Sequence, residues 1–322
     1  MYTNNDINNK SIFVINCIEK RNLRVLNGEL LLEDTSTSKT LTKMPFQKIL
    51  ALFVIGHISI TTPLIDKCKR FNVALIVVKP NLRPVFIQAN SAEANYLLRQ
   101  QQYLINPNDL NAAKAIVKNK ISNQKQLLVN TRKKDVQTIA GIKVCEQALK
   151  AINKTTKYEQ LMGIEGYIAR RFFELYYIEQ SWDTRRPRTK CDIINATLDI
   201  GYTILFNFIE CYVRMFGFDV YKGVYHRLWF RRKSLICDLV EPFRCIIDRA
   251  IRTAFNKGQC KASDFRYEKG EYVLKREKNG DYQRLFFEAL IKYKSEIFLY
   301  IQAYYRAFMQ NKSYEHYPQF KI

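Results

Sequence analysis

Two carboxylates and a histidine lie close together in the chain between residues 226 and 241. His226 is one of only three histidines, and Asp238 and Glu241 follow it within fifteen positions. Hard cations such as Mg²⁺ and Mn²⁺ prefer carboxylate oxygens, and Mn²⁺ also accepts imidazole. These residue types therefore indicate metal chemistry, although a lone histidine is more often a core or surface residue than a ligand.

The spacing of Asp238 and Glu241 allows two interpretations. Residues three positions apart share one face of a helix, so both carboxylates would point the same way. The same spacing also predicts a capping box, in which Asp238 caps the helix start and Glu241 reaches back to it. Pro242 fits an early turn better than the middle of a helix, and taken alone the capping interpretation is favoured.

A third carboxylate, Glu165, stands between Gly163 and Gly166 in an otherwise apolar and aromatic segment. Each glycine lowers helix stability by roughly 1 kcal/mol, a cost that is explained if another group must approach the backbone closely. The alternative is an acid at a helix start, facing the macrodipole, with Gly163 ending the preceding turn. Both interpretations stay open on local grounds.

The chain carries a large excess of positive charge. Lys plus Arg number 52 against 30 Asp plus Glu, which gives a net charge of +22 and a pI near 9.6. Such an excess indicates a polyanionic partner, and phosphate contacts supply most sequence-independent affinity for nucleic acid. An anionic membrane is disfavoured because the charge is spread along the chain and does not flank an apolar segment.

Basic residues also flank each candidate ligand: Arg170 and Arg171 follow Glu165, Arg227, Arg231, Arg232 and Lys233 follow His226, and Arg244 follows Glu241. A single charged residue is usually solvated, but clustering around acids favours recruitment of DNA that the acids alone would repel. We predict that at least Arg231, Arg232 and Arg244 contact phosphate. Tyr167 is predicted to contact the substrate.

Several classes of protein are disfavoured. The sequence has no GxxxxGK[ST], GxGxxG, GxSxG or HExxH motif, so ATP hydrolysis and dinucleotide chemistry are not expected. No apolar run approaches the ~20 residues of a membrane-spanning helix, and the N-terminus lacks a signal peptide. The eight cysteines form no CxxC pair and are interpreted as reduced apolar residues. We therefore expect a cytoplasmic protein.

The chain is predicted to have an α+β fold, with a small, mainly β domain over residues 1–90. Asn27-Gly28 lies between two apolar runs and predicts a tight hairpin. The segment "ITTPLIDKCKRF" predicts a short helix with a threonine cap and Pro63 in its first turn. The runs "ILALFVI", "VALIVV" and "KPNLRPVFIQA" predict strands or buried core.

From about residue 91 the pattern becomes helical, which predicts a larger, predominantly α-helical catalytic domain over residues 91–322, with the boundary near residues 88–95. Apolar residues recur at spacings of three and four, and few glycines or prolines interrupt them. The predicted helical segments are 91–105, 109–129, 157–180, 191–217, 238–258 and 281–310. Lys269-Gly270 predicts one hairpin lying on these helices.

Together, these residues resemble the Cas1 family of CRISPR adaptation integrases. The family's Gly-x-Glu-Gly helix is matched by residues 163–166, followed by its Ala-Arg at residues 169–170. Its Ser-Leu-x-x-Asp-Leu-x-Glu-x-Phe-Arg run is matched by residues 234–244, with His226 fifteen positions before Glu241. The segment with Asp192, Asn195, Gly201 and Tyr202, and the block "GHISITTPLIDKCKRFNVALIVV", are also similar to the family.

The chain departs from the family pattern at three places. The common Gly-Phe-Leu-His is Gly-Val-Tyr-His at residues 223–226, the usual Gly-Arg is Arg232-Lys233, and a frequent Arg-Pro-Pro is Arg186-Pro187-Arg188. None of these changes removes a proposed ligand. The altered loop after His226 is expected to change contacts with DNA, and Arg186 joins the predicted DNA-binding residues.

The resemblance implies an activity, a cofactor and partners. Glu165, His226 and Glu241 would bind Mg²⁺ or Mn²⁺, while Asp238 would assist or only cap a helix. The implied reaction is strand transfer by the 3′-hydroxyl of protospacer DNA into the CRISPR leader-repeat boundary, with associated endonuclease and disintegration activity on branched DNA. A homodimer, with the N-terminal domain in dimerisation, and a Cas2 partner are also implied.

Two alternatives from other classes stay open. The first is a stand-alone metal-dependent nuclease acting on branched DNA. The second is a non-catalytic basic protein that binds DNA, in which the acids only cap helices and the charge alone makes the contacts.

Overall fold

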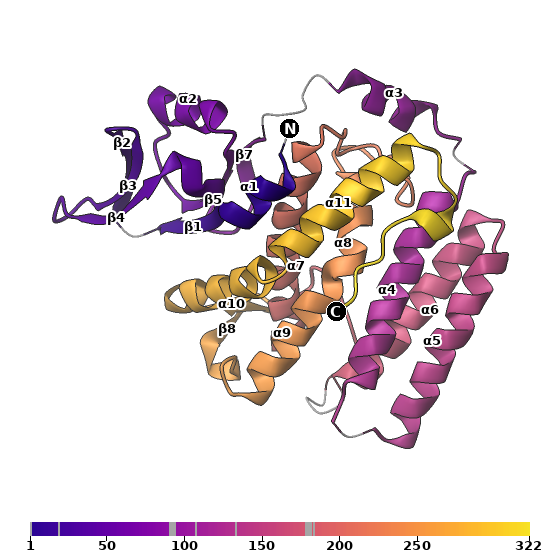
Figure 1. Ribbon diagram of the computed structural model, residues 1–322. Coiled ribbons are helices and arrows are strands. Elements are labelled where there is room, and N and C mark those ends of the chain that lie inside the picture. The colour runs from indigo at the N-terminus through magenta and orange to yellow at the C-terminus, as the bar shows by residue number, and fades with distance from the viewer. Residues whose placement is uncertain are drawn as a thin grey trace.

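The computed structural model describes residues 2–18, 20–89, 95–106, 108–132, 134–177, 182 and 184–322. Two β-sheets lie at one end of the molecule, three long helices lie at the other, and the remaining helices connect them (Figure 1). The predicted α+β class, with a β-rich N-terminal part and a mainly helical remainder, is confirmed. In the described part of the chain, no helix is both long and apolar enough to cross a membrane.

The first sheet is mixed and has the strand order β1 (Ser11–Cys17), β5 (Ile49–Gly56), β6 (Ala74–Val78), β7 (Pro84–Gln88). β1, β5 and β6 are parallel, and β7 is antiparallel to β6. Every residue of β5 is buried because alternate side chains enter different cores. Phe53 packs toward the helices, whereas Leu52 and Val54 pack toward the second sheet.

The second sheet is antiparallel and consists of β2 (Arg21–Leu26), β3 (Glu29–Asp34) and β4 (Thr40–Pro45). The hairpin predicted at Asn27-Gly28 is confirmed, with both residues at positive φ (51° and 80°), as a type I′ turn requires. α2 (Thr62–Arg70) has Pro63 in its first turn as predicted. A threonine, Thr61, occupies the N-cap position as predicted, but its side chain makes no capping hydrogen bond.

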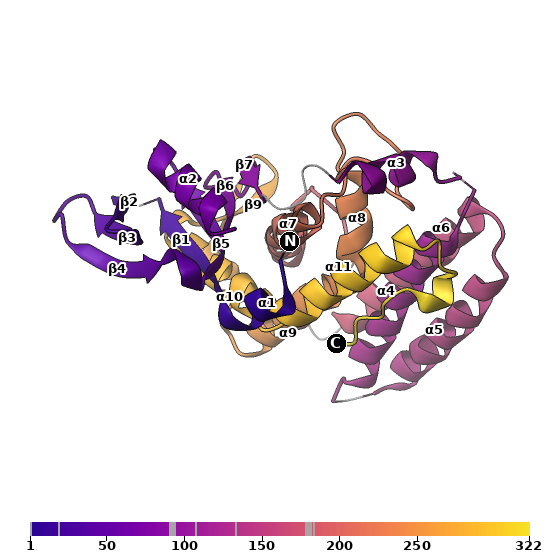
Figure 2. The ribbon, with the colours of Figure 1, turned by 45° about the horizontal axis from the view of Figure 1, so that its top comes forward.

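The helical part of the chain begins after β7, the last strand of the first sheet. Its helices are α3 (Tyr96–Leu104), α4 (Asn111–Val129), α5 (Val136–Lys154), α6 (Tyr158–Tyr176), α7 (Ile193–Met215), α8 (Ser234–Val240), α9 (Arg244–Asn256), α10 (Asn279–Ile291) and α11 (Lys294–Met309), and a further short helix, α1 (Asn4–Asn9), precedes β1. α4, α5 and α6 run side by side as a three-helix bundle (Figures 1 and 2). α7 lies between the sheets and this bundle and contacts α8, α9, α10 and α11.

α5 was not among the predicted helices. Gly141, in its second turn, weakens the helical signal but allows close packing on α6, since a Cβ there would force the Leu175 side chain to shift. Only a narrow stripe of α5 is buried, with Cys145, Ala148 and Ile152 on it. Tertiary packing of that stripe on its neighbours therefore supports a helix whose local preference is weak.

One hydrophobic core runs from the first sheet into the helices. Ile55 of β5, Ile76 of β6, Phe208 of α7 and Phe298 of α11 belong to the same buried cluster. The predicted boundary at residue 90 lies in residues 90–94, outside the described part of the chain. The packing on either side of it is continuous, so the sheet supports the helices directly.

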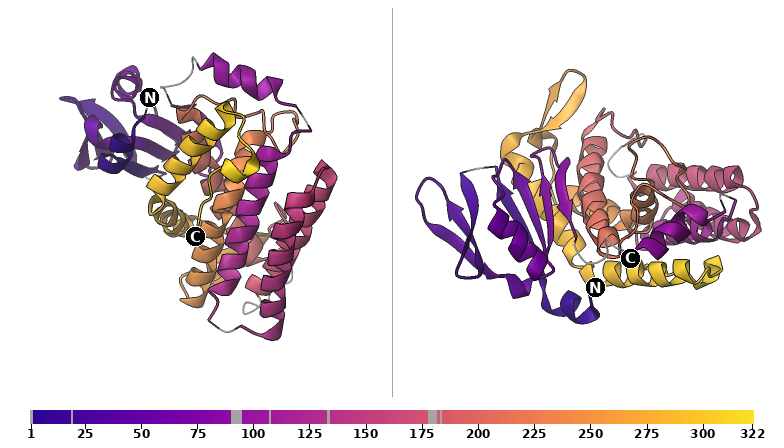
Figure 3. Two further views of the ribbon diagram at one scale, coloured as in Figure 1. Left: turned by 45° about the vertical axis from the view of Figure 1, so that its right-hand side comes forward. Right: turned by 90° about the horizontal axis from the view of Figure 1, so that it is seen from above.

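The predicted hairpin at Lys269-Gly270 is confirmed. β8 (Phe265–Glu268) pairs with β9 (Glu271–Leu274), and the two turn residues have φ of 50° and 85°. The backbone N–H of Tyr272 donates to the carbonyl of Lys190, and β9 contacts α7. The hairpin projects from the helices on the side of the sheets (Figure 3).

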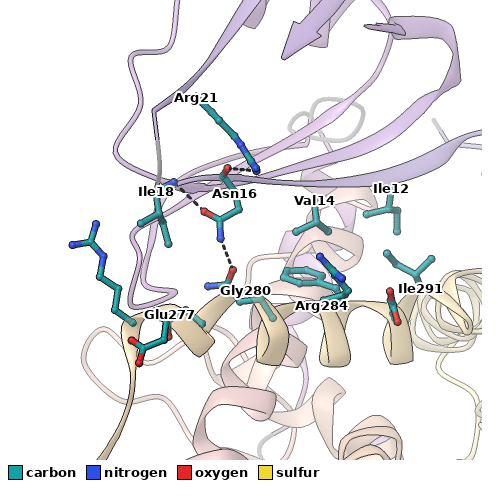
Figure 4. A pocket seen from close by; sticks show the side chains of 14 residues that line it. Ile12, Val14, Asn16, Ile18, Arg21, Glu277, Gly280, Arg284 and Ile291 are labelled. Carbon is teal, nitrogen blue, oxygen red and sulfur yellow. Dashed lines mark hydrogen bonds between the residues drawn. The ribbon is translucent and has the colours of Figure 1, made fainter. Parts of the chain in front are cut away.

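A cavity of about 460 Å³ lies between β1 and α10 (Figure 4). Asn16 bridges its two walls, because its side-chain amide donates to Gln283 (3.2 Å) while its Oδ1 accepts from the backbone N–H of Ile18. Arg21 and Arg284 also line it. None of the candidate ligands lines this cavity, so the site must be found elsewhere.

Candidate functional site

A buried lysine, which was not among the predicted site residues, joins two of the three candidate ligands. The Nζ of Lys120, on α4, forms an ion pair with Oε1 of Glu165 on α6. The same Nζ forms a second ion pair, 2.6 Å from Oε2 of Glu241. Lys120 is 7% exposed and Glu241 is 5% exposed. Two carboxylates from distant parts of the chain thus converge on one positive charge.

Neighbouring cations keep Glu241 ionised despite its burial. Burial by itself raises the pKa of a carboxyl group, but Arg244, Lys120 and His226 together lower the pKa of Glu241 to about 2. Arg244 lies 2.9 Å from Oε1 of Glu241. Burial lowers the pKa of Lys120, but the two glutamates outweigh this effect and raise the pKa overall. The site therefore holds fixed charges of both signs.

Arg244 also packs against Tyr202, besides pairing with Glu241. Its guanidinium lies over the ring of Tyr202 on α7, 4.7 Å from the ring centroid, and Arg185 lies 5.5 Å from the same centroid. The Tyr202 hydroxyl donates to the buried Asp248 on α9 (2.6 Å). A continuous chain of contacts thus links Asp248 to the carboxylate of Glu241.

Asp238 orients the loop that carries His226. One oxygen accepts the backbone N–H groups of Val224 and Tyr225 (2.7 and 3.0 Å), and the other accepts the backbone N–H of His226 (2.8 Å). The Nδ1 of His226 lies 2.6 Å from Oδ1 of Asp238. With Nδ1–H donating to this carboxylate, Nε2 is the ring nitrogen whose lone pair is available to a ligand.

The predicted capping box at Asp238 and Glu241 is wrong. α8 begins at Ser234, so Asp238 lies within the helix, and its carboxylate faces the loop of residues 224–226. Glu241 opens the 3₁₀ turn Glu241–Phe243 and faces Lys120. The two acids thus have different partners, and Asp238 positions the histidine. No side-chain capping bond is made at this helix start.

Gly223 makes room for this arrangement. A Cβ at residue 223 would lie 2.6 Å from Oδ2 of Asp238 and 2.8 Å from the carbonyl oxygen of His226. Any larger residue would therefore displace the carboxylate or the loop. This glycine, at the start of the family's Gly-x-x-His motif, is required by close approach and not by an unusual φ.

The glycines beside Glu165 have open space around them. Both lie in the interior of α6, which starts at Tyr158, so the interpretation of Glu165 as a helix-start acid is wrong. Among the described residues, no atom beyond their own helix would lie within 4 Å of a Cβ at Gly163 or Gly166. The chain itself does not fill this space. A ligand from outside has access to the backbone there.

The predicted DNA-binding residues fall into two groups. Several are engaged within the chain: Arg170 and Arg171 pair with Glu174, Lys233 pairs with Glu210, Arg232 donates to Ser234 and to the carbonyl of Arg227, and Arg244 pairs with Glu241. The backbone N–H of Arg186 donates to Asn195. Tyr167 and Arg231 are exposed to solvent. The prediction that these residues contact DNA stays a prediction.

The segment between the two ligand motifs is structural. Asp192 caps α7 by accepting the backbone N–H of Asn195 (2.7 Å), and Asn195 accepts from Arg185 (2.9 Å). Gly201 lets α7 approach α9 and α10, since a Cβ there would meet Ile247 at 2.5 Å. These contacts place Tyr202 beneath Arg244.

Lys120 has a signal in the sequence that was not used. It follows Ile116 by four positions and Val117 by three and precedes Gln124 by four, so it falls on the buried face of α4. A lysine on such a face is almost never left without a partner. The pattern indicates a buried charge, but it does not say which acids balance it.

Comparison with known proteins decides the family. The family model described as "CRISPR associated protein Cas1" matches residues 18–288. The chain belongs to the Cas1 family. The resemblance stated from the motifs is thereby confirmed.

Individual relatives cover most of the chain. The CRISPR-associated endonuclease Cas1 1 of Thermodesulfovibrio yellowstonii is 28% identical over 233 residues, which are 69% of this chain and 73% of that protein. A chain of a partial Cas6-RT-Cas1–Cas2 complex superimposes with a TM-score of 0.71 at 22% identity, covering 96% of this chain and 98% of its own. A casposase bound to integration product superimposes with a TM-score of 0.74 at 19% identity, and the match covers 94% of this chain and 91% of the casposase chain. The Cas1 fold is therefore shared along nearly the whole chain.

The structure brings two of the three predicted metal ligands to one positive charge, but the three ligands do not together enclose a metal position. Among the described residues, no group of three or more His, Cys, Asp or Glu side chains is arranged to hold a metal ion. Glu165 and Glu241 nevertheless face a common cation, the Lys120 ammonium. Carboxylate oxygens are the ligand type that Mg²⁺ and Mn²⁺ prefer. The predicted three-ligand metal centre stays a prediction.

Proposed function

We propose that this chain is a divalent-metal-dependent DNA integrase of CRISPR adaptation. It would join the 3′-hydroxyl of protospacer DNA to a phosphodiester at the leader-repeat boundary, acting in the cytoplasm. The observation that carries the proposal is the convergence of Glu165 and Glu241 on one positive charge. Both carboxylates contact Nζ of Lys120, and Asp238 orients His226 in the loop just before α8. Membership of the Cas1 family supports the same activity.

Three side chains would hold the metal: Glu165 and Glu241 through carboxylate oxygens and His226 through Nε2. When bound, Mg²⁺ or Mn²⁺ supplies a Lewis acid that stabilises charge on the reacting phosphate and helps deprotonate the attacking hydroxyl. Asp238 keeps the imidazole in the required tautomer. Arg244 keeps Glu241 ionised.

The proposed reaction exchanges one phosphodiester for another. The 3′-oxygen of the incoming strand forms a bond to phosphorus, the existing P–O bond of the target breaks, and the released 3′-oxygen takes up a proton. No nucleotide hydrolysis is needed, which agrees with the missing nucleotide-binding motifs. If water replaces the 3′-hydroxyl, the same chemistry gives endonuclease cleavage, and the reverse reaction gives disintegration of branched DNA.

The charge of the chain suits this substrate. A net charge of +22 favours a long polyanion. We propose that Arg170, Arg171, Arg186, Arg231, Arg232, Lys233, Arg244 and Tyr167 contribute to DNA binding. Arg231 and Tyr167 are exposed, so they are available in the free protein. The others would exchange an internal partner for phosphate.

Joining both ends of a duplex requires two active sites held apart. We therefore propose a homodimer that assembles with a Cas2 protein. The fold shared with a chain of a Cas6-RT-Cas1–Cas2 complex supports this assembly. The fold shared with a casposase bound to integration product supports strand transfer over simple cleavage.

A strand-transfer assay tests the proposal. The purified protein, with and without Cas2, is incubated with a supercoiled plasmid carrying a repeat array, short labelled duplex DNA and Mn²⁺ or Mg²⁺. We expect label to become covalently joined to the plasmid only when the 3′-hydroxyls are free. Glu165→Gln should abolish joining while DNA binding is kept, and Glu146→Gln, an exposed acid of the same bundle, should leave joining unchanged.

The same assay separates the alternatives. Cleavage of branched DNA without joining, independent of Cas2, would indicate a stand-alone nuclease. Normal DNA binding with no metal-dependent reaction on any substrate would indicate a non-catalytic DNA-binding protein. Joining by Glu165→Gln at the wild-type rate would exclude the site described above.

A further inference from the structure

Three consecutive large apolar residues project into solvent beside the candidate site. Leu228 is 56% exposed, Trp229 is 73% exposed and Phe230 is 82% exposed. In the described part of the chain, this is the only run of three exposed large apolar residues. Residues 228–230 are called the apolar tip below. Such a cluster on a protein surface usually marks a binding site.

The apolar tip is presented by a closed loop. The carbonyl of Arg227 accepts from Oγ of Ser234 (3.1 Å) and from the guanidinium of Arg232, while the backbone N–H of Arg232 donates to the carbonyl of Trp229 (3.0 Å). Arg231 takes a left-handed conformation, with φ of 58°. These bonds join the two ends of the loop at its base and hold the apolar side chains outward.

The base of the loop is joined to the candidate site at both ends. Arg227 follows His226 directly, and its guanidinium lies 4.5 Å from the ring centroid of Tyr158, in the first turn of the helix that carries Glu165. Ser234 opens α8, which carries Asp238. This connection between α7 and α8 loops out next to α3 (Figure 2). The apolar tip therefore flanks the place where a DNA end would react.

Positive charge surrounds the apolar tip. Arg227, Arg231 and Arg232 lie within two residues of it, and the Arg231 guanidinium is 5.0 Å from the ring centroid of Phe230. Aromatic rings flanked by arginines suit unpaired nucleotides, because rings stack on bases while guanidinium groups bind phosphate. Paired bases inside a duplex offer no free face for such stacking.

We infer that the apolar tip binds unpaired bases at the DNA end that enters the site, with Trp229 and Phe230 as stacking residues. The inference rests on the proposed function only for the identity of that DNA. A lipid surface and a second copy of this chain are the other occupants that an exposed apolar loop would suit. Nucleic acid is favoured because arginines flank the rings and the tip lies next to His226.

Intrinsic fluorescence reports on the apolar tip directly, because the chain has only two tryptophans. Trp182 packs against Tyr177 and Phe173, and its indole N–H donates to Asp192. In Trp182→Phe, Trp229 is the only indole. If that variant does not fold, the difference between wild type and Trp229→Phe isolates the same signal.

Three titrations of Trp182→Phe test the inference: a duplex with unpaired 3′ tails, a blunt duplex of equal length, and anionic phosphatidylserine vesicles. We expect the tailed duplex to quench Trp229, and the blunt duplex to bind by anisotropy with little quenching. Vesicles should leave the emission unchanged. Quenching by vesicles alone, or a blue shift that grows with protein concentration without DNA, would overturn the inference in favour of a lipid or a second copy.

Alanine variants test how much the apolar tip contributes to the affinity for tailed DNA. Trp229→Ala and Phe230→Ala should each weaken binding of the tailed duplex by about tenfold, with little effect on the blunt duplex. Tyr267→Ala, which removes an exposed aromatic from the β8–β9 hairpin, should have no such effect. Equal affinity of wild type and the double variant for tailed DNA would refute the inference.

Failure of this inference is distinguishable from failure of the proposed function. Glu165→Gln lies outside the apolar tip, so it should keep the quenching even though joining is lost. Normal strand transfer without quenching would remove the apolar tip from the mechanism and leave the integrase. Quenching without strand transfer would leave a binder of DNA ends.

Discussion

The Nζ of Lys120 lies 2.6 Å from Oε2 of Glu241, and both side chains are almost completely buried. α4 and the 3₁₀ turn after α8 are joined by this contact, although more than a hundred residues separate them in the chain. The ammonium is shared with Glu165, while Glu241 also pairs with Arg244. In the proposed function, a divalent cation would bind the same two glutamates.

Replacing Lys120 by methionine should destabilise the metal-free protein. Glu165 would lose its ammonium partner and Glu241 would keep only Arg244, and removing one partner of a buried ion pair typically costs up to about 3–5 kcal/mol. Mn²⁺ should restore part of this loss in Lys120→Met, because it would neutralise the same carboxylates. Urea unfolding with and without Mn²⁺ measures both effects.

Lys125→Met, which breaks an exposed pair with Glu146, is the control and should change stability by less than about 1 kcal/mol. Equal stability of the two variants would contradict the prediction.

The glycines of the two ligand motifs should respond oppositely to alanine. Gly166→Ala should stabilise the protein by about 0.5–1 kcal/mol, because the residue lies inside α6 with open space around it. Gly223→Ala should destabilise it, since the new Cβ would lie 2.6 Å from Oδ2 of Asp238. Thermal unfolding of both variants measures the difference. A destabilised Gly166→Ala would mean that the space beside Glu165 is not open.

Asp238→Ala should loosen the loop before α8. The substitution leaves three backbone N–H groups and the Nδ1 of His226 without their acceptor. Unsatisfied buried donors cost about 1–3 kcal/mol each. Limited trypsin digestion, read by mass spectrometry, should show faster cleavage at Arg227, Arg231 and Arg232. Cleavage at wild-type rates would show that other contacts suffice to hold the loop.

Asp248 should make the stability of the protein depend on pH. Burial raises its pKa to about 7, an effect that outweighs the hydrogen bond from Tyr202 and the charge of Arg244. The native state therefore holds this proton up to about pH 7, whereas the unfolded chain releases it near 3.8. Protonated Asp248 therefore stabilises the native state at low pH. As the pH rises from about 4 to about 7, the free energy of unfolding should fall by up to about 4 kcal/mol.

Urea unfolding of wild type and Asp248→Asn at pH 4.5, 6 and 8 measures this contribution. The asparagine cannot ionise and keeps an oxygen for the Tyr202 hydroxyl, so its stability should fall less between pH 4.5 and 8. Asp281→Asn, which changes an exposed acid, should follow the wild type. Parallel curves for wild type and Asp248→Asn would show that Asp248 is ionised throughout.

Much of the architecture was determined locally. Positive φ at both turn residues needs Asn-Gly or a residue pair of similar freedom, so the hairpins at residues 27–28 and 269–270 were predictable. The continuous apolar run of β5 and the apolar spacing of α6 and α7 are also visible in the sequence, because a short apolar run favours a buried strand and spacings of three and four match the helical period. α5 was missed because its stripe is narrow and Gly141 obscures it.

The candidate ligands could be named from the sequence, but their environment could not. The resemblance to the Cas1 motifs singled out Glu165, His226 and Glu241. Only the tertiary structure brought Lys120 between the two glutamates and turned Asp238 from a supposed cap into the partner of His226. These contacts join side chains up to 121 positions apart. Local spacing carries no information about such pairs, because they form only when the helices of the core pack together.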